Sequence, residues 1–173
     1  MELMSLLGKI LFKNREKAKQ FSLIHEYIKQ NSIFFEHYPL AYKDPVITCL
    51  EASYARGVNL SKELKHIVVM TSQGFCLVHV LGNKRVDTNK VSNFLEVKNA
   101  KLADLKLIEK NEMHRGTIFP FVEPFWSMLN LIDYEVLKKD WLTTNDGTLR
   151  GFIKFSPKLL LFIPNNKVDV FAD

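Results

Sequence analysis

The segment from Lys65 to Asp87 constrains the fold of this chain more than any other stretch. It holds two apolar runs, residues 67–70 and 75–81, and the short polar sequence 71–74 separates them. Runs this rich in β-branched and large apolar side chains are typical of strands buried in the middle of a sheet. The glycine that ends the polar sequence can adopt the positive φ that a tight hairpin needs. The segment therefore predicts a central β-hairpin, with Lys65 at the start of its first strand.

The composition predicts one globular domain. The chain has 173 residues, and 47% of them are hydrophobic, which is enough for a substantial core. No apolar run approaches the length of a membrane span, and the sequence has no internal repeat or low-complexity segment. We expect a single domain over residues 1–173, with residues 1–30 as an N-terminal helical extension.

The charge and the cysteines narrow the possible partners and the compartment. The formal net charge is +5 and the pI is about 9.1, which is compatible with a polyanionic partner such as RNA. Cys49 and Cys76 lie in apolar contexts without paired spacing. This pattern favours core thiols in a reducing compartment over a disulfide, and hence a cytoplasmic protein.

The first fifteen residues carry a basic amphipathic pattern. Apolar residues between Leu3 and Leu11 fall on one helical face, and basic residues follow on the polar side and beyond. Such a helix either rests on a membrane surface or a partner, or packs onto its own domain. Packing onto its own domain is the commoner case, so membrane contact through residues 1–15 stays the lesser alternative. The acidic residue at position 2 argues against a secretory peptide.

The rest of the chain alternates between predicted helices and strands. Asp87, Asp104 and Asp133 stand where helix N-caps are expected, and Gly57 stands where a helix should end. Two predicted hairpins interrupt the alternation, which indicates a mixed sheet with helices packed around it. The expected helices are residues 16–30, 46–56, 88–95, 104–112 (burying Leu105 and Ile108) and 158–162; the expected strands are 33–38, 67–70, 75–81, 98–102, 127–132, 141–144 and 149–155; residues 164–173 are expected to form a tail.

Common catalytic signatures are missing from the sequence. There is no G-x-x-x-x-G-K loop, no G-x-G-x-x-G fingerprint and no G-x-S-x-G elbow. The five histidines are scattered, and no pair has the spacing of a metal site. The sequence therefore predicts neither a metal nor a cofactor.

Several short motifs nevertheless occur in a recognisable order between residues 33 and 160. A strand that carries His37 is followed by a helix ending at Gly57, and then by Lys65 just before the hairpin. A G-x-x-x-P loop from Gly116 to Pro120 and a turn at Gly147 come after them. In this order the motifs resemble the YbaK/prolyl-tRNA synthetase-associated editing family, whose members are deacylases that clear mischarged tRNA.

The resemblance implies a trans-acting aminoacyl-tRNA deacylase on an α+β fold with a mixed, curved (barrel-like) sheet and surrounding helices. Lys65 would contact the 3′ end of the substrate, and the loop that begins at Gly116 would orient the ester through its N–H groups, so these two are the expected catalytic residues. The substrate itself would organise the attacking water. The implied partner is the acceptor end of aminoacyl-tRNA, with a synthetase as a second partner and no DNA. The expected substrate-binding residues are His37, His66, Pro120, Phe119, Asn145 and Gly147.

Some positions depart from the family pattern. His66 stands where the family usually has a small residue, and Ile118 and Phe119 are large for a loop that is usually small. Phe152 lies near a position that is acidic in close members. His66, Ile118 and Phe119 are expected to narrow or close the pocket. They keep a second hypothesis open: a catalytically inactive YbaK-like module that binds aminoacyl-tRNA, a synthetase or a membrane surface.

Overall fold

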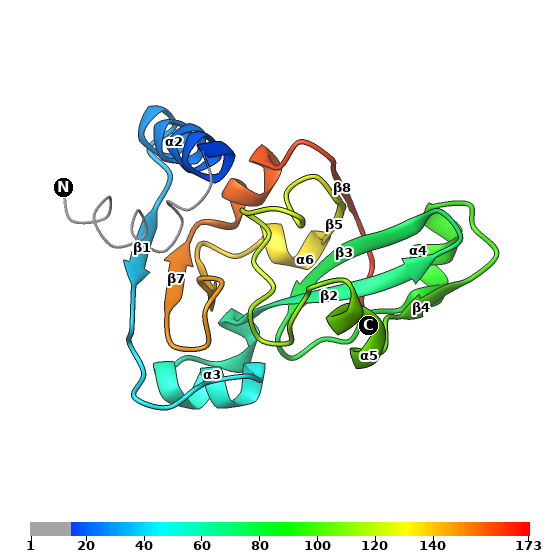
Figure 1. Cartoon of the computed structure of the whole chain (residues 1–173), viewed down its shortest axis with the longest axis horizontal. Helices are drawn as coiled ribbons and strands as arrows, with labels where there is room; N and C mark the ends of the chain where they lie inside the picture. The colour runs from blue at the N-terminus through cyan, green and yellow to red at the C-terminus, as the bar shows by residue number, and fades with distance from the viewer. Residues whose placement is uncertain (1–14) are drawn as a thin grey trace.

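The computed structural model describes residues 15–173, except for the side chains of residues 15–19 and 21. The amphipathic pattern predicted before residue 15 lies outside the described residues. The described strands form two sheets, with helices arranged around them (Figure 1). The predicted α+β class is therefore confirmed.

The larger sheet has five strands in the order β4-β2-β3-β5-β8 and is mixed. The predicted hairpin forms its centre, because β2 and β3 pair antiparallel along their whole length. The glycine at the turn adopts the expected positive φ, 114° at Gly74. The pairing of β3 with β5 and of β5 with β8 is parallel. The strands are β2 (Leu64–Thr71), β3 (Gly74–Leu81), β4 (Ala100–Leu102), β5 (Leu129–Asp133) and β8 (Asn166–Asp169).

The smaller sheet has three antiparallel strands in the order β1-β7-β6. They are β1 (Phe35–Tyr38), β7 (Phe152–Phe155) and β6 (Leu142–Asn145). Among the described residues, a single isolated bridge between Glu63 and Thr143 links this sheet to the start of β2. Both sheets are open, so the predicted barrel-like sheet is not confirmed.

Side chains explain where most helices begin. The carboxylates of Asp87, Asp104 and Asp133 accept hydrogen bonds from the first turns of α4, α5 and α6, as predicted. No described helix is long and apolar enough to cross a membrane. The helices are α2 (Arg15–Gln30), α3 (Cys49–Arg56), α4 (Thr88–Phe94), α5 (Leu105–Lys110) and α6 (Tyr134–Leu137), with 3-10 turns η1 (Leu60–Lys62) and η2 (Pro157–Phe162).

Helix α3 begins three residues later than predicted because Thr48 and Glu51 form a capping box at its N-terminus. It ends at Gly57, as predicted, with a left-handed φ of 63°. The predicted burial of Leu105 is wrong: its side chain is 49% exposed, and Ile108 alone anchors α5 in the core. The second predicted hairpin forms between β6 and β7. Residues 146–151 connect its strands, which is longer than the predicted four-residue turn at 145–148.

The prediction of a C-terminal tail is also wrong. Residues 166–169 form β8, and Phe171 is completely buried. The Oδ2 atom of Asp133 accepts hydrogen bonds from the backbone N–H groups of Phe171 and Ala172 at 2.8 and 2.9 Å. Asp133 therefore caps α6 with one carboxylate oxygen and fixes the C-terminal segment with the other.

Alternation along β2 sends neighbouring side chains to different parts of the molecule. Val68 packs in a cluster with Leu77 and Ile118, whereas Val69 packs with Val91 on the other face of the sheet. Lys65 and His66 therefore leave β2 on opposite faces.

Candidate functional site

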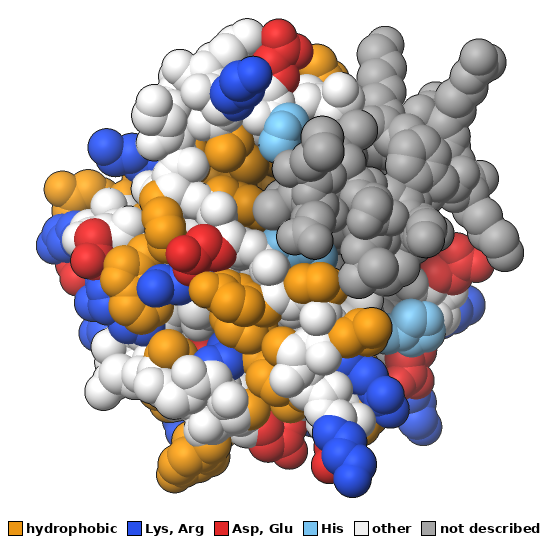
Figure 2. Space-filling view, turned by 90° about the vertical axis from the view of Figure 1, so that its left-hand side faces the viewer, with side chains coloured by type: hydrophobic (Ala, Val, Ile, Leu, Met, Phe, Trp, Pro, Cys, Tyr) orange, Lys and Arg blue, Asp and Glu red, His pale blue; other side chains and the backbone are white. Residues whose placement is uncertain are grey.

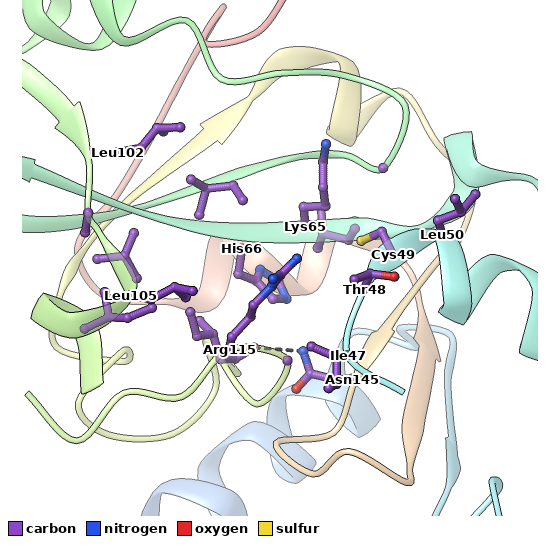
Figure 3. Close-up of a pocket in the computed structure, with 18 of the residues that line it drawn as sticks. Ile47, Thr48, Cys49, Leu50, Lys65, His66, Leu102, Leu105, Arg115 and Asn145 are labelled. Carbon is purple, nitrogen blue, oxygen red and sulfur yellow. Dashed lines mark hydrogen bonds between the residues drawn. The ribbon is translucent and has the colours of Figure 1, made fainter. Parts of the chain in front are cut away.

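An open cavity of about 480 Å³ lies along one edge of β2. Its walls come from β2, the segment before α3, β4, α5 and the loop that begins at Arg115 (Figure 3). Its volume lies within the range of about 300–1,000 Å³ that is typical of small-molecule sites. Most of the lining is aliphatic; the polar side chains that line it are those of Thr48, Cys49, Lys65, His66, Arg115 and Asn145.

The cavity exists because β4 covers only part of the outer edge of β2. Pairing with β4 starts at Val69. Just before it, the Val68 carbonyl accepts a hydrogen bond from the Ala103 N–H at 3.0 Å, and near the start of the strand the Leu64 carbonyl lies 3.2 Å from the hydroxyl oxygen of Thr144. Since backbone groups alternate along a strand, the N–H and C=O of His66 face the same uncovered edge. No described residue bonds to them, so a short strand edge is open to a ligand.

Lys65 lies in the cavity wall, but its amine points away from the Gly116 loop. The side chain leaves β2 on the side opposite Arg115 and Asn145 (Figure 3), and Nζ donates to the carbonyl of Lys84. Burial lowers the pKa of the Lys65 amine; Cys49 opposes this shift and Arg85 adds to it. An ammonium group has three N–H donors, so donors remain for a ligand that approaches from this side.

Gly116 lines the opposite side of the cavity, and only glycine fits there. Its φ is 83°, and a Cβ atom would lie 2.8 Å from Cδ2 of Leu149 and 3.2 Å from Cα of Ile47. The position is therefore restricted by both backbone conformation and packing. No described residue accepts a hydrogen bond from the Gly116 N–H, which leaves this donor available at the lip of the cavity.

The bulky residues of the G-x-x-x-P loop do not close the cavity. Phe119 is 5% exposed and packs edge to face against Phe121 in the core, with ring centroids 5.4 Å apart. Pro120 is also buried, and neither residue lines the cavity. These two predicted substrate-binding residues are thus buried in the core, away from the cavity. Ile118, in contrast, forms part of the cavity wall.

The His66 side chain belongs to a buried chain of hydrogen bonds. Its Nδ1 lies 2.8 Å from Nδ1 of His79, and its Nε2 lies 2.8 Å from the Thr144 hydroxyl. Nε2 of His79 lies 2.7 Å from Oδ1 of Asn130, whose amide donates to the carbonyls of Phe125 and Met128. Burial lowers the pKa of His66 well below its usual range and that of His79 to about 4, so both rings are neutral at pH 7.

This arrangement fixes the direction of the chain. Because Oδ1 of Asn130 can only accept, Nε2 of His79 carries a proton, and its Nδ1 accepts from Nδ1 of His66. Nε2 of His66 then accepts from Thr144. Both ring nitrogens of His66 therefore have partners inside the protein, so the ring has no free polar atom for a ligand.

Asn145 connects the cavity loop to the turn after β6. Its Nδ2 donates to the Ile118 carbonyl at 2.9 Å, and its Oδ1 accepts from the Gly147 N–H at 2.8 Å. Asn145 lines the cavity, whereas Gly147 adopts a φ of 89° against Phe119. Of these two predicted residues, Asn145 is at the site and Gly147 supports it.

The structure does not bring His37 to the cavity. Its Nε2 lies 2.9 Å from Oδ2 of Asp146, and both side chains are almost fully buried. Burial would raise the pKa of Asp146, but hydrogen bonds from His37 and Thr148 outweigh it and lower the pKa. The pair joins β1 to the loop between β6 and β7.

Two charged groups at the cavity were not singled out from the sequence. Arg115, which directly precedes Gly116, projects into the cavity (Figure 3). No described carboxylate lies within 4.0 Å of its guanidinium. Behind the cavity, a recess of about 50 Å³ is lined by Glu63, Arg56 and Thr144. An arginine before the G-x-x-x-P glycine, and a glutamate at the start of a buried strand, were the available signals.

The surface beside the site has mixed charge. On the face that carries β1 and α3, Lys and Arg side chains are interspersed with acidic and hydrophobic ones (Figure 2). Exposed hydrophobic side chains there include Tyr38, Leu40 and Tyr54, with exposed fractions of 40%, 66% and 80%. On the described part of this face, basic side chains do not form a continuous stripe (Figure 2).

Comparisons with known proteins agree with this picture. A sequence model described as the aminoacyl-tRNA editing domain matches residues 43–159. None of the curated proteins compared with the chain matches it.

Solved structures share the fold. A hypothetical protein, APE2540, has a TM-score of 0.72 and 22% identity over 87% of this chain and 99% of its own. A structure reported as that of a "putative trans-editing enzyme for prolyl tRNA synthetase" has a TM-score of 0.67 and 21% identity over 90% of this chain and 96% of its own.

Proposed function

The chain belongs to the aminoacyl-tRNA editing domain family, and on this basis we propose that it is a deacylase that acts in trans on a mischarged tRNA. The reaction is hydrolysis of the ester between the amino acid and the 3′-terminal ribose. We propose that residues 1–173 form one domain for this purpose, with helix α2 in an N-terminal extension, and that it works in the cytoplasm.

The observation that carries the proposal is the open cavity at the uncovered edge of β2. Its volume of about 480 Å³ suits an aminoacyl-adenosine end, and Phe119 does not fill it. His66 and Gly116 line it from two different segments, and their backbone N–H groups have no hydrogen-bond partner among the described residues. Preorganised N–H donors of this kind stabilise the charge that develops on an ester oxygen during hydrolysis.

Lys65 and Arg115, the two cations that line the cavity, bind different parts of the tRNA end. Lys65 uses its free N–H donors on the 3′-terminal phosphate or on the developing oxyanion. Arg115, on the other side of β2, holds a second phosphate as a planar donor. Asn145 positions the loop of Gly116 through the Ile118 carbonyl, so its role is indirect.

The test is hydrolysis of tRNAs charged with alanine, serine, threonine, cysteine and a set of larger amino acids. The wild type should cleave at least one of them, and Lys65→Ala should lower kcat/KM by a factor of about 10²–10³, the cost of removing one stabilising donor. Absence of hydrolysis by the wild type on every tRNA, together with retained tRNA binding in a gel-shift assay, would favour the binding module instead.

A further inference from the structure

The recess behind the cavity holds a buried carboxylate. The side chains of Glu63 and Arg56 are 1% and 4% exposed, and Nη1 of Arg56 lies 2.5 Å from Oε2 of Glu63. The Thr143 hydroxyl donates to Oε1 at 3.0 Å. Each carboxylate oxygen has two lone pairs, so Glu63 can accept further hydrogen bonds from the recess.

The recess and the cavity are continuous. Both are lined by Cys49, Gly116 and Asn145, so the recess opens where the Gly116 loop forms the lip of the cavity. Its volume of about 50 Å³ leaves room for a few water molecules, since one needs about 10–15 Å³ measured in this way. The charge of Glu63 raises the pKa of the Cys49 thiol, and that of Lys65 lowers it. Both charges therefore lie near Cys49, where the recess meets the cavity.

A purely structural role explains this ion pair poorly. Burying two charges is expensive, and apolar side chains of similar volume are often at least as stabilising. Lysine–carboxylate pairs of the described residues lie at the surface, such as Lys138 with Glu135. The other buried pair, His37 with Asp146, lines neither the cavity nor the recess.

We propose that Glu63 is a catalytic residue that accepts a proton from the hydrolytic water held in the recess. The inference rests on the proposed deacylase function and goes beyond it, because it assigns the proton to the protein instead of to the substrate alone.

The step balances without any further reactant. The oxygen of the water attacks the ester carbonyl carbon, and one of its protons moves to an Oε atom of Glu63, directly or through a second water. The tetrahedral oxyanion faces the N–H donors at the cavity. When the bond from carbon to the ribose oxygen breaks, the proton returns from Glu63 to that oxygen, which gives the free amino acid and the tRNA hydroxyl.

The charge state of Glu63 suits this exchange. Burial raises its pKa to about 7, while Arg56 and Thr143 oppose the rise. A base of this strength is effective near neutral pH. The groups that face Glu63 do not titrate there: burial raises the pKa of Cys49 to about 11 and that of Tyr42 above its usual range, and Arg56 stays charged.

The experiment measures kcat/KM between pH 5.5 and 8.5 for the full chain, with the mischarged tRNA of the panel that the wild type cleaves fastest. The wild-type rate should rise to a plateau with a break near pH 7. Glu63→Gln should lower the plateau by a factor of about 10²–10³ and remove that break. Glu135→Gln, the same change on the surface of α6, should leave both unchanged.

A second variant keeps the test decisive if Glu63→Gln does not fold. Thr143→Val removes a donor that lowers the Glu63 pKa, so it should move the break to higher pH with little change in the plateau. The substrate ammonium titrates equally in all variants and cannot cause a difference between them. The inference is overturned if the wild type cleaves the substrate but neither variant changes the profile. It falls together with the proposed function if the wild type cleaves nothing.

Discussion

Lys65 and His66 are neighbours on β2, yet they belong to two regions with opposite properties. The region around His66 is closed: its ring, His79, Asn130 and Thr144 satisfy one another in a buried chain. The cavity edge is open, because the backbone groups of His66 and the N–H of Gly116 have no partner among the described residues. Committed polar groups stabilise a fold, whereas uncommitted ones beside a cavity are free to bind.

The comparison gives a rule for the effects of substitutions. A change in the closed region should reduce stability and leave the activity of the folded protein nearly intact. A change at the open edge should reduce activity and leave stability nearly intact. Gly116 is an exception: it lines the cavity and is also tightly packed, so its substitution should reduce both stability and activity.

The largest combined effect on stability and activity is expected for Gly116→Ala. Strain at its positive φ costs about 1–3 kcal/mol, and the contacts with Leu149 and Ile47 add about 1–3 kcal/mol of overpacking. The displaced loop should also lower kcat/KM by a factor of about 100. Urea unfolding and deacylation kinetics measure both effects. Gly74→Ala is the matched control: its φ is positive, but a Cβ meets nothing within 4 Å, so it should lose stability from strain alone and keep its activity.

A pair of substitutions separates the two regions directly. His79→Leu leaves Nδ1 of His66 and Oδ1 of Asn130 without partners, at a cost of about 1–3 kcal/mol for each. Its kcat/KM should stay within about threefold of the wild type at a temperature where it is folded. Lys65→Met should lose activity while the free energy of unfolding changes by less than about 1 kcal/mol. If His79→Leu were fully stable and inactive, the division into closed and open regions would be wrong.

The pH dependence of stability between pH 6.5 and 4.5 tests the same division into closed and open regions. Both histidines have lowered pKa values in the folded protein, so the unfolded chain binds two more protons below pH 6.5. Glu63 opposes them, because its raised pKa of about 7 keeps one extra proton on the folded state. With one net proton, stability should fall by about 1.4 kcal/mol per pH unit as the pH decreases.

Glu63→Gln removes the opposing group and should steepen this slope to about 2.7 kcal/mol per pH unit. Urea titrations at several pH values measure both slopes. Identical slopes in the two proteins would mean that Glu63 does not hold a proton in this range.

The smallest effect is expected for Arg115→Ala. Loss of one phosphate contact should raise KM several-fold with little change in kcat, and should reduce the salt dependence of tRNA binding by about one charge. Lys167→Ala makes the same charge change on the exposed strand β8 and should alter neither quantity. A decrease in kcat at unchanged KM would place Arg115 in the chemical step instead.

Local patterns in the sequence were sufficient for much of the fold. The β2–β3 hairpin and the aspartate caps depend on neighbouring residues, and the structure has them where the patterns predict them. The strand β8 was missed because it forms by pairing with the distant strand β5, and the residues after it are fixed by the carboxylate of Asp133. The exposure of Leu105 also depends on tertiary packing.

The site was predictable only in part. Lys65, Gly116 and Asn145, which the ordered motifs single out, line the cavity, and their roles there stay predictions. The direction of the Lys65 amine and the burial of Phe119 could not be read from spacing, because each depends on which face of an element meets the core. The positions of Arg115 at the cavity and of Glu63 at the recess also depend on tertiary packing.

Binding at the open edge of β2 is tested most directly by an amide NMR titration of the full chain with an aminoacyl-adenosine analogue that carries an amide in place of the ester. If the open edge of β2 is the binding site, the largest shifts should occur at the backbone N–H groups of His66 and Gly116 and at the side-chain amide of Asn145. The imidazole signals of His79 should hardly move. Shifts centred on the small sheet around His37, with the signals of His66 and Gly116 unchanged, would show that the ligand binds elsewhere.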